Sequence, residues 1–501
     1  MRERKSHPPS PKPVREAGYI RKDELDDHLD IHLPVPTRTV SNEEFVPIGQ
    51  TSQQSAVEAE LLNIACSSAR SLGIDRRSFL RSSCGMAAAF IAMNSVYGKF
   101  FQVEAAEMFD AGATTKHDFF IFDVQTHHVA TRQQAPKAEQ EMLDYFLGLR
   151  RYGKKMNPAL ASHEPRPEDL HLANYIKEVF LDSDTDVAAI SALPSHSLEG
   201  NVIPPEQLAN SRNWVNELTT TPRMVNHGIF SPELGKLNLE TMHVQAEKLK
   251  VDAWKGYTGM SKSKDVTGWR IDDEKLSYPA LELSRKLGIR NICLHKGFPL
   301  PGNVGDWAPH DIVKASKDFP DLNFLIYHSG FKDVGSMLAN ADSGFRKDAY
   351  VPWVSDLCQW AEKYPHVKKN VFMELGTTFA VTVTASPALT AHILGMIIRS
   401  FGDDRVLWGT DSIFWGSPQW QIEAFRRFQI PEDLQKRFGY KPLTDEARAK
   451  IFGLNAARVY GVDAKARRGP IPGDYLERLK KQYRQAGGPF PSNTQYGWVR
   501  A

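Results

Sequence analysis

One stretch of the sequence constrains the fold more than any other, a mainly apolar run that ends in polar and imidazole side chains. The run covers residues 119–124, and Gln125, His127 and His128 come next. An apolar run of this length suits a strand that is buried on both faces. In a parallel α/β barrel, such strands present functional side chains from their carboxyl ends. The stretch therefore favours a barrel with a functional site at the end of its first strand.

The same pattern recurs after residue 118, where short apolar strands alternate with segments of helical spacing. This alternation is typical of the α/β class, and we predict a (β/α)8 TIM barrel. A doubly wound open sheet is the alternative, but no glycine-rich phosphate loop follows the first strand, which argues against a nucleotide-binding version. The eight predicted strands cover residues 119–124, 186–193, 224–230, 251–257, 290–295, 324–328, 371–375 and 406–409.

The chain around the barrel divides into further predicted regions. Residues 1–54 are polar and rich in proline and charge, which predicts a disordered leader. Residues 55–106 carry an export-signal pattern, residues 107–466 are expected to form the barrel, and residues 467–501 are expected to form a C-terminal strap on the barrel or on a neighbouring subunit. Within the barrel region, residues 137–174 are predicted to form an insertion with helical content at the barrel mouth.

An arginine pair in the second region indicates export. Arg76 and Arg77 are followed, after one serine, by Phe79 and Leu80, then by an apolar stretch over 85–96 and by small residues that end at Ala106. This order resembles a twin-arginine signal, and the stretch is too short to span a bilayer. We therefore expect the twin-arginine machinery as a partner, a periplasmic or secreted location, and a mature chain that begins near Ala106. The alternative is a chance arginine pair before a buried helix.

Charge and cysteine usage exclude other classes of function. The 501 residues carry a formal net charge of +2, which gives no case for nucleic acid as a partner. Cys66, Cys84, Cys293 and Cys358 show no paired spacing, so neither a disulfide framework nor a cysteine-based zinc site is expected. A stable membrane span is not expected either.

Four of the predicted strands end in residues that can bind a metal ion. The first gives Gln125 and His127, the fifth gives His295, the sixth gives His328 and the eighth gives Asp411. In a closed parallel barrel all strand carboxyl ends open on one face, so these groups are expected to converge. Imidazole and carboxylate groups together suit Zn, Mn or Fe.

These strand ends and one later motif carry a resemblance to a known family. Residues 123–127 read Asp-Val-Gln-Thr-His, and residues 451–461 read Ile-Phe-Gly-Leu-Asn-Ala-Ala-Arg-Val-Tyr-Gly. Over about residues 118–463 the chain resembles the amidohydrolase superfamily. Within it, the resemblance is to the branch that includes the aminocarboxymuconate-semialdehyde and hydroxybenzoate decarboxylases. That branch usually has Asp-x-His-x-His at the end of the first strand.

The resemblance implies a cofactor and a role for each strand end. One divalent metal, Zn or Mn, would be held by His127, His295 and Asp411 with Gln125 close by, and His328 and Asp411 would be catalytic. A homodimer is also implied. Gln125 departs from the family pattern, because its amide oxygen is a weaker ligand than an imidazole nitrogen. Weaker metal binding follows, or none if the site is degenerate.

Three more residues are predicted to contact the substrate. Lys255 lies near the end of the fourth strand, where we expect it to contact a substrate carboxylate or solvent; the alternative is a carbamylated lysine that bridges two metals, as in binuclear members of the superfamily. Glu374, at the end of the seventh strand, is expected to hold a substrate group or to orient His328. His227 lies near the end of the third strand.

Three functions remain open from the sequence. The first, which the sequence favours, is a metal-dependent hydrolase of a small amide, lactone or ester, with a metal-activated water and His328 as base. The second is a non-oxidative, metal-dependent decarboxylase of a small carboxylic acid, which Lys255 or Lys296 would favour if they face the metal. The third is a catalytically inactive exported barrel that acts as a binding protein, for which Gln125 is the support.

Overall fold

The architecture is a barrel of eight parallel strands, each paired with the next along the chain. The computed structural model describes residues 18–29, 31–42, 44–45, 47–110, 118–129, 170–193, 203–259, 268–299, 307–332, 349–467, 473–489 and 497–500. The strands of the barrel are β2 (Phe122–Thr126), β3 (Val187–Ile190), β4 (Met224–Ile229), β5 (Ala253–Tyr257), β6 (Asn291–His295), β7 (Asn323–Tyr327), β8 (Val371–Glu374) and β9 (Val406–Leu407).

The barrel closes between its first and last strands. The Val124 N–H donates to the Trp408 carbonyl over 3.0 Å, and Thr126 and Ser412 form a parallel bridge at the same seam. Closure of this kind removes the free edges of the sheet. The predicted (β/α)8 barrel is therefore confirmed, and the open-sheet alternative is excluded. All eight predicted strands are present, with ends shifted by no more than three residues.

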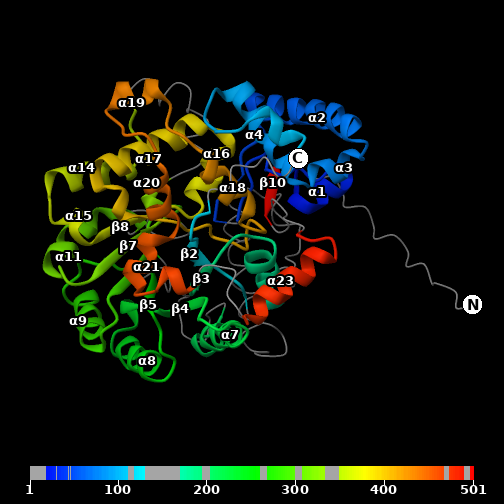
Figure 1. Cartoon of the computed structure of the whole chain (residues 1–501). Coiled ribbons are helices and arrows are strands. Elements are labelled where there is room, and N and C mark those ends of the chain that lie inside the picture. The colour runs from blue at the N-terminus through cyan, green and yellow to red at the C-terminus, as the bar shows by residue number, and fades with distance from the viewer. Residues whose placement is uncertain are drawn as a thin grey trace, which may run out of the picture.

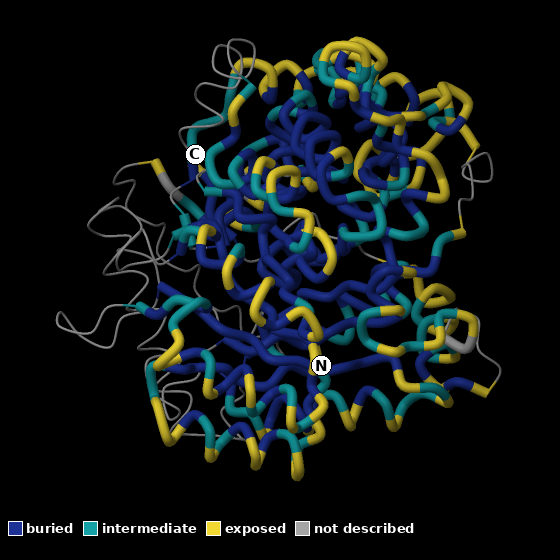
Figure 2. Tube along the Cα trace, turned by 90° about the vertical axis from the view of Figure 1, so that its left-hand side faces the viewer, coloured by how far each residue is buried: buried dark blue, intermediate teal, exposed yellow. Residues whose placement is uncertain are grey.

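Helices cover the outside of the barrel (Figure 1), and the buried chain runs through its centre (Figure 2). Inside, alternate strand residues fill the core, because successive side chains point to opposite faces. Phe122 is fully buried there, and its ring lies 5.3 Å from that of Tyr460. The helices after the first barrel strand are α6 (Leu172–Ile176), α7 (Pro205–Glu217), α8 (Lys236–Glu247), α9 (Ser277–Leu287), α11 (Ile312–Asp318), α14 (Val354–Lys363), α15 (Val367–Asn370), α16 (Thr378–Ala385), α17 (Pro387–Phe401), α18 (Gln419–Arg427), α19 (Glu432–Phe438), α20 (Asp445–Ala449), α21 (Asn455–Tyr460), α22 (Ala464–Arg467) and α23 (Tyr475–Gln485).

Three helices that precede the barrel in the chain pack on one side of it (Figure 1). Phe90 is fully buried, and its ring lies 4.8 Å from Phe101. Phe101 in turn contacts Phe428, just after α18, with ring centroids 5.6 Å apart. The region predicted to carry the export signal is thus docked on the barrel through aromatic side chains. The three helices are α2 (Ser52–Leu72), α3 (Arg76–Leu80) and α4 (Ser83–Tyr97).

For residues 18–54 the prediction of a disordered leader is wrong. β1 (Tyr19–Arg21) pairs antiparallel with β10 (Trp498–Arg500), and α1 (Lys22–Leu29) follows. The extended chain after α1 is well buried, with Val35 and Thr39 each 1% exposed. It shows no apolar period because an extended segment anchored by a partner strand from far along the chain needs none. Residues 1–17 lie outside the described residues.

The C-terminal extension packs on the same chain. Arg223, just before β4, donates to Glu477 of α23 over 2.6 Å, and β10 completes the ribbon with β1. The predicted insertion over 137–174 lies outside the described residues up to residue 169. Among the helices that the structure describes, none is long and apolar enough to cross a membrane.

Candidate metal centre

The predicted ligands lie at the carboxyl ends of the barrel strands, and all are buried. His295 is the last residue of β6, and His127, His328 and Asp411 follow the ends of β2, β7 and β9. Each of the four exposes 2% or less of its surface. His328 and Asp411 have left-handed backbones, with φ of 60° and 61°. Non-glycine residues held in this region are strained, and such strain gathers at functional sites.

Asp411 is the centre of one hydrogen-bond network. Its Oδ1 accepts from Gln125 Nε2 over 2.9 Å, and its Oδ2 accepts from Asn42 Nδ2 over 3.1 Å and from the Thr377 hydroxyl. His127 Nε2 lies 3.0 Å from Oδ1. Burial alone would raise the pKa of the Asp411 carboxyl, but the adjacent His127 imidazole and these donors lower it. Asp411 is therefore a carboxylate at neutral pH.

Backbone carbonyls fix the tautomers of the three histidines. His127 Nδ1 lies 3.0 Å from the Ser191 carbonyl, and His328 Nδ1 lies 2.9 Å from the Gly376 carbonyl. His295 Nε2 lies 3.4 Å from the Phe298 carbonyl, a looser contact. A carbonyl can only accept, so each of these nitrogens carries the proton. Second hydrogen bonds of this kind orient metal-binding histidines in proteins.

The remaining ring nitrogens face one another or a carboxylate. His328 Nε2 lies 3.1 Å from His295 Nδ1, and His127 Nε2 lies 3.0 Å from Asp411 Oδ1. With the tautomers above, both atoms of each contact are acceptors and repel one another. A proton on one of them, or a cation bound by at least one of them, would relieve this repulsion. Burial lowers the pKa of His328 to about 4 and that of His295 well below its usual value, so a proton is disfavoured near neutral pH. These residues therefore fit a divalent metal ion.

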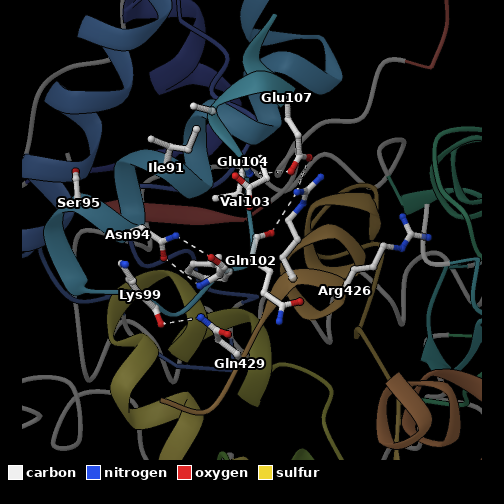
Figure 3. A pocket seen from close by; sticks show the side chains of 13 residues that line it. Ile91, Asn94, Ser95, Lys99, Gln102, Val103, Glu104, Glu107, Arg426 and Gln429 are labelled. Carbon is white, nitrogen blue, oxygen red and sulfur yellow. Dashed lines mark hydrogen bonds and ion pairs between the residues drawn. The ribbon is translucent and has the colours of Figure 1, made fainter. Parts of the chain in front are cut away.

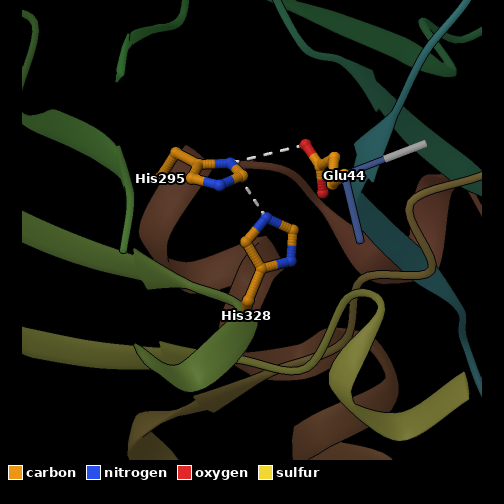
Figure 4. A group of neighbouring side chains, drawn as sticks. All are labelled: Glu44, His295 and His328. Carbon is orange, nitrogen blue, oxygen red and sulfur yellow. Dashed lines mark hydrogen bonds and ion pairs between the residues drawn. The ribbon is translucent and has the colours of Figure 1, made fainter. Parts of the chain in front are cut away.

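The sequence analysis missed one further candidate ligand, Glu44. Ligand atoms of Glu44, His295 and His328 lie within 4.8 Å of one another, and the three side chains converge in Figure 4. The Glu44 carboxylate approaches His295 Nδ1 to 3.9 Å. Burial, and then the charge of Asp411, raise the pKa of Glu44 to about 8. Nothing in the sequence marks this residue, because it lies in the stretch predicted to be disordered.

Asn42 joins this group to the Asp411 network. Its Nδ2 donates to Glu44 over 3.0 Å and to Asp411 over 3.1 Å. His127 and Asp411 are not members of the compact group of three. The shared amide nevertheless places the carboxylates of Glu44 and Asp411 side by side, so the predicted ligands and Glu44 form one polar centre.

Gln125 lies in the centre with one atom unused. Its Nε2 donates to Asp411, while its Oε1 is buried and has no hydrogen-bond partner among the described residues. A Cβ at Gly376 would lie 2.2 Å from this Oε1, so only glycine allows the approach. This amide oxygen is free to accept a contact from a metal ion, consistent with the outer metal contact that the sequence predicts.

Lys255 is buried within the barrel beside the same centre. Its Nζ has no hydrogen-bond acceptor among the described residues and lies 3.6 Å from the centroid of the Tyr327 ring. Burial lowers its pKa to about 8, partly offset by neighbouring acidic groups such as Asp411. Lys296, the other lysine considered, instead forms a 2.8 Å ion pair with Asp311.

Glu374 and His227 have protein partners of their own. Glu374 accepts the backbone N–H of His328 over 2.9 Å and that of Gly376 over 2.6 Å, and burial raises its pKa to about 8. It thus holds the backbone that carries His328. His227 contacts Ser191 and the Tyr460 hydroxyl at 3.1 and 2.9 Å, inside the barrel.

Aromatic rings surround the histidines. Tyr257 stacks on His295 with centroids 4.5 Å apart, and Trp307 meets the same ring edge-on at 5.2 Å. Phe298 lies 5.3 Å from His328. These flat, apolar walls suit a small substrate with a planar body.

A cavity of about 820 Å³ lies elsewhere, between α4 and the end of α18 (Figure 3). Lys99, Glu104 and Arg426 are among the residues that line it, and none of the predicted site residues does. Its two arginines are engaged with the protein: Arg426 contacts Asp184 at 3.1 Å and Arg427 contacts Glu107 at 2.7 Å. The chemistry predicted from the sequence is therefore not located there.

Comparison with known families adds to this geometry. The amidohydrolase family model matches residues 235–462, which include β5 to β9 and the later motif. This part of the chain is similar to the amidohydrolases. The matched part of the barrel contains His295, His328 and Asp411, whereas Gln125 and Glu44 lie outside it. A comparison with curated protein sequences finds no match.

Several solved structures are similar to this chain at low sequence identity. The 5-carboxyvanillate decarboxylase of Sphingomonas paucimobilis is 15% identical, with 69% of this chain and 100% of that chain covered and a TM-score of 0.42. The manganese-bound 5-carboxyvanillate decarboxylase of Novosphingobium aromaticivorans is 13% identical, with 69% and 98% covered and a TM-score of 0.45. The 2,6-dihydroxybenzoate decarboxylase of Rhizobium is 15% identical, with 68% and 99% covered and a TM-score of 0.41. At these values they carry no argument about what this chain converts.

Proposed function

We propose that the protein is a metal-dependent, non-oxidative decarboxylase of a small carboxylic acid. The observation that carries this proposal is the buried ammonium of Lys255, which has no hydrogen-bond acceptor among the described residues. A buried charge without a partner is costly, and a substrate carboxylate would satisfy it. The aromatic rings around the histidines favour an acid with a planar body.

A divalent metal, Zn or Mn, belongs to this proposal. His127, His295 and Asp411 would hold it, with the Oε1 of Gln125 in reach as a weaker contact. When bound, the ion would supply positive charge that polarises the substrate oxygens. Mixed nitrogen and oxygen ligands suit both metals, so elemental analysis has to choose between them.

The residues of the site divide the remaining work. Lys255 pairs with the substrate carboxylate and fixes its direction. The bond to the carboxyl carbon then breaks, carbon dioxide leaves and a proton takes its place. That proton comes from solvent, and His328 and Asp411 are the candidates for relaying it to the carbon, because both lie in the centre with left-handed backbones that fix their direction.

Hydrolysis of a small amide, lactone or ester is the second candidate. The specific observation that favours it is the tautomer of His328, whose Nδ1–H donates a hydrogen bond to the Gly376 carbonyl. The Nε2 is left as an acceptor, and a pKa of about 4 keeps the ring neutral. A neutral imidazole with a free lone pair suits a base that takes a proton from water.

Two assays on the purified full chain test the proposal. Elemental analysis should find about one Zn or Mn per chain. A panel of small aromatic and aliphatic acids should then release carbon dioxide, with a solvent proton in the product, while amides, lactones and esters stay intact. Turnover of the second panel alone would replace decarboxylation with hydrolysis. A chain that takes up no metal would support the binding-protein alternative.

We also propose that the protein is exported by the twin-arginine route, with the residues before Ala106 retained on the barrel, and forms a homodimer. The arginine pair supports the first part, since Arg76 and Arg77 are exposed on α3. Changing both to lysine should retain the protein in the cytoplasm on cell fractionation, while Arg70→Lys, at another exposed arginine, should not. The dimer rests on the family resemblance, and sedimentation velocity of the purified chain tests it.

A further inference from the structure

We propose that Glu44, carried into the barrel mouth by the N-terminal segment, is a metal ligand that compensates for the weak amide ligand at Gln125. The N-terminal segment is defined here as residues 18–50. This inference rests on the proposed metal-dependent function and adds a ligand that no barrel strand provides. It is argued from three features: the anchoring of the segment, the placement of the carboxylate, and the charge of the ligand set.

The segment is anchored on both sides of Glu44. Before it, Ser41 exchanges two backbone hydrogen bonds with Trp498, at 2.8 and 3.0 Å, and both residues are buried. After it, Phe45 packs on Phe298 and Trp415, with ring centroids 5.6 and 6.5 Å away. Contacts on both sides hold the backbone of Glu44 over the strand ends.

Asn42 sets the direction of the Glu44 side chain. The Asn42 side-chain oxygen accepts the Glu44 backbone N–H over 3.1 Å, and its Nδ2 donates to the Glu44 carboxylate over 3.0 Å. The same Nδ2 reaches Asp411. One asparagine thus holds the backbone and the carboxylate of Glu44 and ties them to a predicted metal ligand. The result is a carboxylate that is 11% exposed and aimed at His295.

The charge of the ligand set explains why a carboxylate is needed there. The predicted ligands from the barrel are neutral imidazoles, the neutral amide of Gln125 and a single carboxylate, Asp411. Glu44 adds a second negative charge, so the two carboxylates together match a divalent cation. Without a cation, two adjacent carboxylates share one amide donor, and like charges at such a site repel. The unpaired Oε1 of Gln125 is a second, independent sign of a cation in this centre.

Titration of the full chain with Mn²⁺ alone tests the inference. Glu44→Gln keeps the shape of the side chain and removes its charge, and should weaken Mn²⁺ binding at least about 10-fold. Adding Gln125→Glu to that variant should restore most of the affinity, because it returns the charge to the same ion from the first strand. Glu247→Gln, at a side chain that is 70% exposed, should bind as the unchanged protein does.

Each outcome has a distinct meaning. If the unchanged chain does not bind Mn²⁺ or Zn²⁺, the proposed function fails. If it binds but Glu44→Gln binds equally well, only the inference about Glu44 is overturned. Should Glu44→Gln fail to fold, judged by circular dichroism, Gln125→Glu alone decides. A site that already holds both charges should gain about 3-fold or less in affinity, whereas a site that lacks the Glu44 charge should gain about 10-fold or more.

Discussion

The part of the chain that matches the amidohydrolase family and the part that precedes it build the same centre by different means. Residues 235–462 provide Lys255, His295, His328 and Asp411 from the ends of barrel strands. The preceding part provides His127 and Gln125 from β2, but also Asn42 and Glu44 from a segment outside the barrel.

The difference shows how a barrel site can change its ligands without changing its strands. A substitution at a strand end, such as Gln125, keeps the backbone and weakens one ligand. A segment that crosses the mouth can then supply a further ligand from another direction, since all strand ends open on one face. The matched part is expected to carry the chemistry, and the preceding part to set metal affinity.

The largest effects should come from two histidines of the matched part. His295→Ala should lose the metal, because it removes a ligand at the end of β6. His328→Ala should retain metal and lower kcat by about 10²- to 10⁴-fold, the range for removing an acid–base group. Metal content and kcat of both purified variants check this. Equal metal content in the two variants would contradict the separate roles.

Substitution of Lys255 tests whether the matched part binds the negative charge of the substrate. Its pKa of about 8 means that the ammonium is present below that pH and is lost above it. The KM for an acidic substrate should therefore rise as pH increases through about 8. Lys255→Met should raise KM by about 10- to 100-fold, the value of a charged hydrogen bond, and should remove this rise. A pH profile of KM that Lys255→Met leaves unchanged would assign substrate binding elsewhere.

The ribbon tests whether the preceding part sets metal affinity. Val499 is fully buried in β10 opposite Ile20, and Val499→Asp should release the N-terminal segment. Mn²⁺ affinity should fall by about 10-fold, close to the effect of Glu44→Gln, because the same ligand is lost. Val244→Asp, at a side chain on α8 that is 41% exposed, is the matched control. If the N-terminal segment of Val499→Asp is readily proteolysed but the variant still binds Mn²⁺ tightly, metal affinity does not depend on the ribbon.

The smallest effect should be on stability, at a close backbone approach within the matched part. A Cβ at Gly409 would lie 1.7 Å from Glu374 Oε1, so Gly409→Ala forces a shift of the buried carboxylate. We expect a loss of about 1–3 kcal/mol and a Tm lower by a few degrees. Gly49→Ala, whose nearest contact is 3.6 Å, should leave the Tm unchanged. Calorimetry of both variants measures the difference.

The strands and the strand-end ligands could be predicted because both depend on local pattern. Apolar runs mark buried strands, and barrel topology then brings His295, His328 and Asp411 together whatever their separation in the sequence. Only the ends of the strands were displaced, as for β2, which begins three residues after its predicted start.

Glu44 could not be predicted because its position depends on a distant pairing. Its segment has no apolar period, and it is ordered by β10 and by contacts with the barrel mouth. The partners of Glu374 were equally hidden, since its hydrogen bonds go to backbone N–H groups that no residue pattern marks. Sequence patterns report local burial, whereas these contacts depend on the finished fold.

The pairing of β1 with β10 also sets an order of assembly. Tyr19 lies opposite Arg500, so the ribbon joins segments that are synthesised at very different times. Contacts between such distant residues form late, because a long loop must close first. All the barrel strands are synthesised before β10. We therefore expect the barrel mouth to stay open until β1 pairs with β10. We therefore expect the metal to enter a nascent barrel, and Glu44 to close over it as the final step of folding.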